Sequence, residues 1–278
     1  MPRILFAALH RPDRSPSQRF RFEQYLSYLE ENGFECTYSY LIDQAADRFF
    51  YKPGNNFKKL VLFLKSGFKR WQEGCNISKY DIVFVQRESF MTGSYFFEKM
   101  VAKSSTKLVF DFDDSIWIQN VSKANKHLSF LKNPDKTKAI IELADLITPG
   151  NDFLADYARQ FNNNICIIPT TIDTEEYKPS SKTKHDHSVC IGWSGSFSTI
   201  EHFKYSLPVL EKIKEKYGDK VYFKVIGDGN YMHPDLNIQG ISWQKEGEVE
   251  ELNEFDIGIM PLMQTEWEKG KCGLKGLQ

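Results

Sequence analysis

The sequence lacks the cysteine spacing of a disulfide framework or a metal site. Its 278 residues include five cysteines, an odd number, and they form no CxxC pair. No cluster of histidines has the spacing of metal ligands. We therefore expect a reduced, cytoplasmic protein without a metal or other cofactor. The cysteines are Cys36, Cys75, Cys166, Cys190 and Cys272.

The sequence also lacks net charge and long apolar runs. Lys and Arg number 36 against 37 Asp and Glu, which excludes a general attraction to nucleic acid, so no nucleic-acid partner is expected. The first apolar run, ILFAAL, meets His10 and Arg11 without a small-residue cleavage site. No apolar stretch approaches the ~18 residues of a membrane-spanning helix. The sequence thus predicts neither secretion nor a membrane span.

Short apolar runs alternate with segments of helical period, the pattern of an α/β fold with parallel sheets. A chain of this length exceeds one ordinary hydrophobic core, which favours two domains. The predicted strands are residues 4–9, 34–38, 82–85, 108–112, 146–148 and 165–168, and then, after a restart, 189–193, 221–226, 238–241 and 256–260. Segments of helical period between them predict, among others, helices over residues 17–31 and 199–217.

A polar stretch separates the two series of strands. Residues 173–187 contain Pro179, several Lys and Ser, and few apolar residues, which is typical of a linker. We therefore predict a Rossmann-like domain over 1–172, a linker over 173–187 and a second Rossmann-like domain over 188–278. The sequence stops inside what reads as the start of a helix, so we expect this second domain to be incomplete.

The loops that follow the strands are where an open parallel sheet binds ligands. After the first strand, four arginines (Arg11, Arg14, Arg19 and Arg21) surround the start of a helix. Arginines and free backbone N–H groups favour an anion such as phosphate or carboxylate. The alternative is a solvated loop with a serine cap.

Three carboxylates end the buried strand at 108–112: Asp111, Asp113 and Asp114. Asp111 and Asp113 share a face by period-two alternation, and in some glycosyltransferases such a pair holds a divalent metal against a diphosphate. Two other interpretations remain. One aspartate hydrogen-bonds a sugar or acceptor without metal, or the group caps a helix and pairs with arginine.

Two glycine-rich segments of the second domain suit a phosphate. Ser194, Gly195 and Ser196 join a strand to a helix through small residues. Lys269, Lys271 and Lys275 surround glycines at the start of the last helix. A solvated lysine cluster is the alternative for the second segment, and Gly227 lies in a turn of a common kind.

Together these segments resemble the family 4 retaining glycosyltransferases of the two-domain GT-B fold. The resemblance is carried by the order of LVFDFDDSIW, ADLITPGNDFLADYARQF, IPTTID, IGWSGS, VIGDG, FDIGIMPL and KGKCGLKGLQ. It implies a nucleotide-sugar held between the domains, chiefly by the second, and an acceptor that approaches from the first. It also implies retention of anomeric configuration without an essential metal.

The resemblance assigns roles by position. The diphosphate would face Ser194, Gly195, Ser196 and the helix start at Gly273 and Leu274, the base would lie beside Gly240 and Trp243, and the ribose near Gln278. Gly227 and Lys269 complete the expected donor site. Asp113 and Lys271 are the expected catalytic residues, and Arg19 and Arg21 the expected acceptor-binding residues.

The sequence departs from the family pattern at catalytic positions. Gly270 and Gln278 stand where the family has a pair of glutamates, Trp193 where it often has arginine, and Asp113 where it often has histidine. Two alternatives to a metal-free transferase follow. One is a sugar-nucleotide-binding or partner subunit without catalysis, or an inactive fragment; the other is a metal-dependent DxD transferase.

The segment from Asn56 to Gly74 is amphipathic and basic. One interpretation is a helix that packs on the sheet. The other is a helix that lies on an anionic membrane, as a peripheral enzyme at the inner face of the plasma membrane would need. The second suits transfer of sugar to a cell-surface polysaccharide, lipopolysaccharide or other lipid-linked acceptor. The apolar stripe is Phe57, Leu60, Val61, Leu64, Phe68 and Trp71, and the flanking cations are Lys58, Lys59, Lys65, Lys69 and Arg70.

Overall fold

The computed structural model describes residues 1–118, 133, 135–180, 188–196 and 199–278. Two compact units make up the chain: unit 1 is Met1–Thr170 with Lys269–Cys272, and unit 2 is Thr171–Glu268 with Gly273–Gln278. The boundary falls after Thr170, and the segment Lys269–Cys272, which the sequence analysis placed in the second domain, groups with unit 1. Residues 181–187 of the predicted linker lie outside the described residues.

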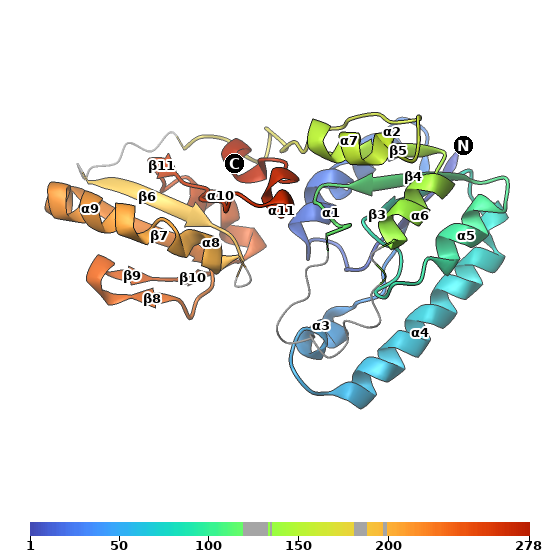
Figure 1. Cartoon of the computed structure of the whole chain (residues 1–278), viewed down its shortest axis with the longest axis horizontal. Helices are drawn as coiled ribbons and strands as arrows, with labels where there is room; N and C mark the ends of the chain where they lie inside the picture. Colours follow the sequence, from blue (N-terminus) through green and yellow to red (C-terminus); the bar gives the residue numbers. More distant parts are fainter. Residues whose placement is uncertain (119–132, 134, 181–187, 197–198) are drawn as a thin grey trace. The chain divides into compact units, whose positions relative to one another are not determined.

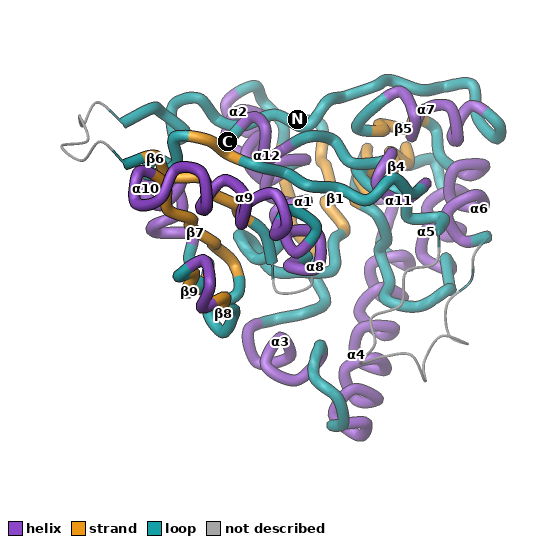
Figure 2. Tube along the Cα trace, turned by 60° about the vertical axis from the view of Figure 1, so that its left-hand side comes forward, coloured by secondary structure: helices purple, strands orange, loops and turns teal. Residues whose placement is uncertain are grey.

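Unit 1 is built on a five-stranded parallel sheet in the order β2-β1-β3-β4-β5 (Figures 1 and 2). This order is that of a doubly wound sheet whose switch point lies between β1 and β3. The predicted strand at 165–168 is reduced to a single bridge, between Ile165 and Ile147, although Cys166 N and Ile168 N also donate to carbonyls of β5. The strands are β1 (Arg3–Ala7), β2 (Glu35–Ser39), β3 (Ile82–Gln86), β4 (Lys107–Phe112) and β5 (Leu146–Pro149).

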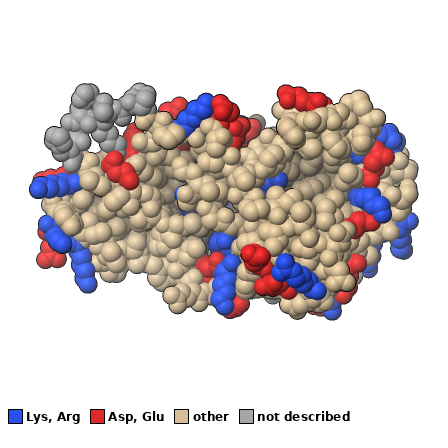
Figure 3. Space-filling view, turned by 90° about the horizontal axis from the view of Figure 1, so that it is seen from above, with Lys and Arg blue, Asp and Glu red and all other residues tan. Residues whose placement is uncertain are grey.

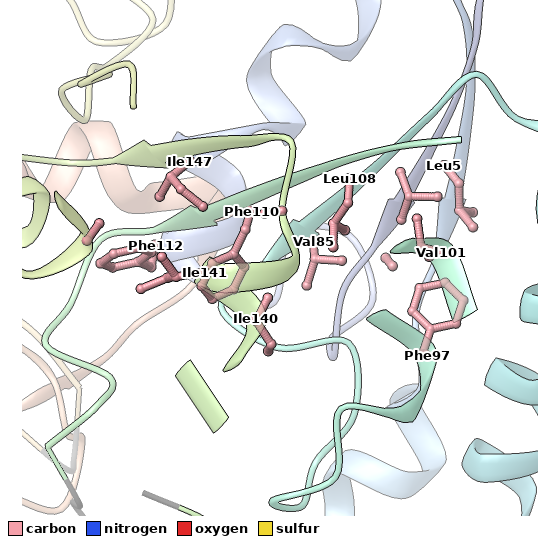
Figure 4. Packing of buried hydrophobic residues seen from close by; sticks show 14 of the residues in the cluster. Leu5, Val85, Phe97, Val101, Leu108, Phe110, Phe112, Ile140, Ile141 and Ile147 are labelled. Carbon is pink, nitrogen blue, oxygen red and sulfur yellow. The ribbon is translucent and has the colours of Figure 1, made fainter. Parts of the chain in front are cut away.

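Alternating side chains of the strands point to opposite faces of the sheet and belong to two apolar layers, one on each face. Leu5 of β1 joins the layer formed with α5 (Phe96–Ala102) and α6 (Lys136–Leu143), where Phe97 and Ile140 pack between the helices and the strands (Figure 4). Ile4 and Phe6 of the same strand point to the opposite layer. Burial of such side chains, about 1.5 to 3 kcal/mol each, stabilises unit 1 on both faces.

The opposite layer contains helices that the sequence predicted as one, over residues 17–31. The structure divides them into α1 (Pro16–Arg21), a 3₁₀ turn (Glu23–Tyr25) and α2 (Leu26–Glu31). Phe22 causes the break: its backbone leaves the helical region, and its buried ring stacks on Phe6. Farther along, α3 (Gln44–Phe50) and the long α4 (Asn56–Cys75) follow β2, and α7 (Asp152–Arg159) follows β5.

Unit 2 has a four-stranded parallel sheet in the order β10-β7-β6-β11. Chain order 3-2-1-4 is the order with which a dinucleotide-binding sheet begins, and its switch point lies between β6 and β11. The strand predicted at 238–241 is divided at Gly240, so that β9 pairs with β8 in a separate antiparallel ribbon. The strands are β6 (Val189–Ser194), β7 (Val221–Gly227), β8 (Met232–His233), β9 (Ile238–Gln239), β10 (Ile241–Ser242) and β11 (Ile257–Gly258).

The helix predicted over residues 199–217 is also divided, into α8 (Ile200–Lys204) and α9 (Leu207–Tyr217). Pro208 stands in the first turn of α9, where its missing N–H costs no hydrogen bond, and it disfavours a helical conformation for the residue before it. Ile200, Phe203 and Leu210 of these helices cover Trp193 and neighbouring strand residues. The remaining helices are α10 (Glu248–Leu252), α11 (Glu266–Lys269) and α12 (Leu274–Leu277).

Both signs of charge are interspersed on the face drawn in the space-filling view (Figure 3). Within the described part of the chain, no helix has the length and apolarity that crossing a bilayer would require.

Candidate functional site

In unit 1, polar side chains gather where β1, β3 and β4 end, at the switch point of the sheet. Asp113 follows β4, and its Oδ1 accepts hydrogen bonds from Ser17 Oγ at 2.6 Å, Arg87 Nε at 2.7 Å and Gln86 Nε2 at 3.3 Å. Ser17 lies in α1, after β1, while Gln86 and Arg87 end β3 and begin its loop. Three strands thus converge on one carboxylate oxygen.

Asp113 is ionised, and the hydrogen bonds described above use only one of its two carboxylate oxygens. Its burial opposes ionisation, but the charge and hydrogen bond of Arg87 outweigh burial and hold its pKa below the ordinary value. Among the described residues, no hydrogen bond reaches Asp113 Oδ2, and the side chain is 12% exposed. A charged oxygen at the open edge of a sheet is suited to accept a hydrogen bond from a ligand hydroxyl.

Arg87 joins two carboxylates. Its Nε contacts Asp113 Oδ1 and its Nη2 contacts Asp114 Oδ2, both at 2.7 Å. Burial disfavours the charge, yet the two aspartates raise the pKa of Arg87 above its ordinary value. Its backbone adopts φ +58°, a conformation that costs a non-glycine residue about 1 to 3 kcal/mol. The bond from Arg87 N to Asp111 O, at 2.7 Å, helps to hold it.

Arg21, a predicted acceptor-binding residue, is fully buried. Its Nη2 contacts Asp111 Oδ1 at 2.5 Å and donates to Thr148 O at 3.0 Å, and its Nη1 donates to Ile168 O. Burial opposes the charge, but the hydrogen bond and charge of Asp111 raise the pKa of Arg21 above its ordinary value. Burial also raises the pKa of the Asp111 carboxyl, against the effect of Arg21. Arg21 therefore ties α1 to β4 and β5, which is a positioning role, and leaves the acceptor contact a prediction.

The other residues of the arginine-rich loop also have protein partners. Arg19 is buried, with its guanidinium 5.0 Å from the centroid of Phe20. Arg11 and Arg14 both contact Asp47, at 2.8 and 2.5 Å. The arginines of this loop thus have partners within the protein. Neither interpretation of the loop, as an anion site or as a solvated loop, predicted this pairing.

His10, in the loop that follows β1, is neutral. Burial, together with the charge of Arg14, lowers its pKa to about 4. The imidazole contacts Gln18 Oε1 at 3.3 Å and the hydroxyl of Tyr51. Near pH 7 this histidine therefore carries no charge in the folded chain.

Two lysines predicted for the donor and catalytic sites lie in unit 1. Lys271 Nζ forms an ion pair with Asp114 Oδ1 at 2.8 Å, and Lys269 Nζ lies 5.9 Å from the centroid of Phe153. Asp114 therefore receives two cations, Arg87 and Lys271. This arrangement keeps Lys271 close to the Asp113 and Asp114 carboxylates, where the sequence placed the other catalytic residue.

In unit 2, the loop after β6 approaches the end of β7 through glycines. Gly195 N donates to Ile226 O at 2.9 Å, and Ser196 N donates to Thr199 Oγ1 at 2.9 Å, so these two amides have protein acceptors. Gly227 has φ +129°, and a Cβ there would lie 2.2 Å from Gly195 O. Only glycine at 227 lets the two strand ends meet this closely.

A tryptophan and a lysine adjoin the Gly195 loop. Trp193 is 1% exposed, and a Cβ at Gly195 would lie 2.2 Å from its indole, so the loop rests on the ring. Lys275 Nζ lies 4.5 Å from the centroid of the same ring. Lys275 belongs to α12, and the start of this helix, with Gly273 as its N-cap and Leu274 as its first residue, was predicted to face the diphosphate. A cation therefore stands next to the loop that the sequence assigned to the diphosphate.

A second cluster of unit 2 surrounds the buried carboxylate of Glu248. Trp243 Nε1 donates to Glu248 Oε1 at 3.0 Å, and Tyr177 OH donates to Oε2 at 2.8 Å. Gln278 Nε2 lies 3.3 Å from Oε1 and 3.4 Å from Tyr177 OH. Trp243 and Gln278, predicted for the base and the ribose, are thus brought together. Gly240 lies at the split between β9 and β10, where a Cβ would lie 2.0 Å from Asp228 O.

The aspartates at the end of β4 and directly after it are paired with protein cations. Arg21 binds Asp111, and Arg87 binds both Asp113 and Asp114. No group of three or more His, Cys, Asp or Glu side chains within the described ranges is arranged to hold a metal ion. The charge that a divalent ion would balance is therefore balanced by guanidinium groups, in line with the arginine-pairing interpretation of these carboxylates.

Arg87, Glu248 and Tyr177 were not predicted as site residues from the sequence. A signal existed for Arg87, because it follows a predicted strand that flanks the switch point, where ligands bind. Glu248 begins a short helix among several other glutamates, and Tyr177 lies in the predicted linker, so neither had a distinguishing pattern.

Comparisons with solved structures establish the fold. Sucrose-phosphate synthase from Thermosynechococcus elongatus has a TM-score of 0.60 at 10% identity, covering 95% of this chain and 77% of that chain. The α,α-trehalose 6-phosphate synthase from Burkholderia multivorans has a TM-score of 0.60 at 9% identity, with 94% and 78% covered. An α-glucosyltransferase in complex with UDP has a TM-score of 0.58 at 12% identity, with 96% and 75% covered.

These neighbours have the GT-B fold, so the chain has it too: two Rossmann-like units with parallel sheets, as the sequence predicted. No protein-family model matches the sequence. A search of curated proteins also gives no match.

Proposed function

We propose that this protein is a glycosyltransferase that moves a sugar from a nucleotide-diphosphate donor to a glycan or lipid-linked acceptor. The observation that carries the proposal is in unit 2, where Gly195 and Lys275 each lie against the indole of Trp193, at the carboxyl end of β6. Open parallel sheets bind ligands at such an end, and a lysine beside a small-residue loop suits a diphosphate. The GT-B fold supports the same reading.

Lys275 is assigned to the leaving diphosphate, together with Ser194, Gly195, Ser196 and the helix start at Gly273. Positive charge aimed at the leaving group stabilises the transition state of glycosyl transfer. Lys275 lies on Trp193, at the position where the resembled family often carries an arginine, so the cation comes from another segment of the same unit.

Glu248 is assigned to the nucleoside. Its carboxylate is held by Trp243 and Tyr177 and lies beside Gln278, at the position where the resembled family has a glutamate. A carboxylate so placed accepts hydrogen bonds from ribose hydroxyls. Glu248 of α10 thus takes the role of the glutamate that the resembled family has at the position of Gln278.

Asp113 is assigned to the sugar or acceptor hydroxyl in unit 1. Three hydrogen bonds fix Oδ1, and Oδ2 remains to accept a bond from the ligand. We propose a metal-free reaction, since arginines neutralise the neighbouring carboxylates. Retention of configuration follows from the resemblance and is checked by the anomeric proton coupling of the product in NMR.

Cell-surface polysaccharide, lipopolysaccharide or another lipid-linked glycan is the proposed acceptor class, with the enzyme at the inner face of the plasma membrane. A sugar-nucleotide-binding subunit without catalysis is the second candidate. It is favoured by the departures at Gly270 and Gln278, where the resembled family has glutamates.

Lys275→Ala tests the donor site. The variant is expected to weaken binding of the preferred nucleotide among UDP, GDP and ADP by about tenfold or more, because a charged contact to the diphosphate is lost. Lys212→Ala removes an exposed lysine of α9 and serves as the matched control, with unchanged affinity. Equal affinities of all three proteins in equilibrium dialysis would exclude the assigned diphosphate site.

Asp113→Asn tests the division of roles between the units. We expect release of nucleotide diphosphate from the donor sugar, in the presence of a lipid-linked glycan extract, to fall about a hundredfold. Donor affinity should stay unchanged because the nucleotide contacts lie in unit 2. Asp152→Asn, at an exposed residue of α7, is the control. Donor binding without release by the unaltered protein would favour the non-catalytic candidate.

A further inference from the structure

One face of α4 exposes a continuous row of large apolar side chains. The exposed fractions are 78% for Phe57, 52% for Leu60, 60% for Leu64, 57% for Phe68 and 51% for Trp71. Their spacing of three and four residues places them on one side of a helix that runs through Asn56–Cys75. An apolar surface of this extent marks an interaction site.

The opposite face of α4 already has its protein partners. Leu62 and Phe63 pack on the cluster of Leu41, Ile42, Ala46 and Phe90. Farther along the same face, Arg70 is fully buried and donates to Ser89 O, Ala8 O and Glu73 Oε2. The interpretation that the exposed row packs on the sheet is therefore wrong, because a different face of the helix makes that contact. Figures 1 and 2 show α4 at the rim of unit 1, with α5 beside it.

A groove of about 460 Å³ adjoins the row, between α4 and the segment that follows β3. Leu64, Phe68 and Trp71 line it on the helix side, and Phe90 and Phe96 on the other. Phe68 and Trp71 stack, with ring centroids 5.8 Å apart. An aromatic-lined groove open to the surface suits an acyl chain, and Trp and Phe are favoured at the membrane–water interface.

The charges of α4 are almost all positive. Lys58 and Lys65 are exposed and Lys59 is half-buried, while the helix has a single acidic residue, Glu73, which pairs with Arg70. Lys69 turns inward and donates to Tyr40 O at 2.7 Å. Lys59 donates to Lys52 O at 2.6 Å, so the exposed Lys58 and Lys65 are the lysines beside the apolar row that suit an anionic surface.

We propose that this face of α4 binds the surface of an anionic lipid bilayer, with the apolar row in the acyl boundary and Lys58 and Lys65 at the headgroups. Charge selects this partner over a second copy of the chain. A symmetric contact between two α4 helices would bring lysine against lysine, whereas anionic lipid is complementary to it. This binding names the surface behind the membrane location in the proposed function, but its test does not depend on sugar transfer.

Flotation of the full chain with lipid vesicles tests the proposal. The protein should float with vesicles of phosphatidylcholine and phosphatidylglycerol in equal amounts, should stay at the bottom with phosphatidylcholine alone, and should be released by salt. Failure to float with either vesicle, or equal flotation with both, would overturn the proposal.

Two pairs of substitutions locate the surface. Leu64→Ser with Phe68→Ser, and separately Lys58→Glu with Lys65→Glu, should each lower the partition coefficient about tenfold or more. The matched controls are exposed residues of unit 2: Tyr205→Ser with Val209→Ser, and Lys212→Glu with Lys220→Glu. All four positions of the first two variants are exposed, so near-UV circular dichroism should show an unaltered fold.

Flotation of the α4 variants at the wild-type level would contradict the assignment to α4. Size-exclusion chromatography tests whether a second copy of the chain covers this face instead of lipid. A wild-type dimer that Leu64→Ser with Phe68→Ser converts to a monomer, without any vesicle binding, would assign the face to a second copy and overturn the lipid proposal.

Discussion

At the scale of single residues, Arg87 connects the candidate site of unit 1. Replacement by methionine leaves Asp113 and Asp114 buried without this cation, so Arg87→Met should lower the free energy of unfolding by about 2 to 4 kcal/mol. Arg159→Met removes an exposed ion pair with Asp156 and should change it by less than about 0.5 kcal/mol. Urea titration measures both. Equal effects of the two substitutions would contradict the pairing described for Arg87.

The lowered pKa of His10 makes the free energy of unfolding depend on pH. The ordinary histidine pKa of 6.5 falls to about 4 on folding, chiefly through burial. Between these values the unfolded chain binds a proton that the folded chain does not, so stability falls as the pH decreases from 6.5 toward 4. The loss from this residue between pH 7 and pH 5 should be about 1 kcal/mol after allowance for partial exposure. Urea titrations at the two pH values should show a smaller difference for His10→Gln, and an identical difference would refute the shift.

The sequence was sufficient to single out several residues of the candidate site, but not to assign the role of each. It singled out Asp113, Trp243 and Gln278, and the structure places the last two together. It could not identify Arg21 as a buried partner of Asp111, because an arginine in a loop has the same local pattern whether it meets a ligand or a carboxylate. Only the tertiary packing of α1 against β4 decides between them.

At the scale of elements, the junction of β6 and β7 depends on Gly227. Gly227→Ala places a Cβ against Gly195 O in a backbone conformation that alanine rarely adopts, so we expect about 2 to 4 kcal/mol of destabilisation of unit 2. Gly258→Ala, with open space at the Cβ and no positive φ, is the control and should change stability by less than about 0.5 kcal/mol. Hydrogen exchange of β6 and β7 amides measures the effect locally. Equal protection of the two variants would contradict it.

Elements were predicted well where periodicity alone determined them and poorly where a single side chain interrupted them. The strands from β1 to β5 lie close to the predicted apolar runs, because a strand buried on both faces needs such a run. The helix at 17–31 is broken by the stacking of Phe22 on Phe6, a contact between distant segments. The apolar row of α4 is likewise exposed because another face of the helix packs on Phe90. Helical periodicity in the sequence shows that an apolar stripe exists, but not which face of the helix contacts the protein.

At the scale of the whole molecule, the alternation of strands and helices, with its restart near residue 189, was sufficient to predict two Rossmann-like units. The solved neighbours have the same GT-B fold at about a tenth of identical residues. Such low identity shows that the fold depends on the pattern of buried and exposed positions. The chemistry depends on a few side chains that this pattern leaves unspecified.

The proposed function requires that the chain bind a nucleotide diphosphate without a metal. Thermal unfolding with UDP, GDP and ADP, each with and without EDTA, tests it most directly. A ligand at a hundred times its dissociation constant stabilises the folded chain by about 2.7 kcal/mol. We predict that one nucleotide raises the unfolding temperature equally in both conditions. A shift that EDTA abolishes, or no shift with any of the three, would contradict the account.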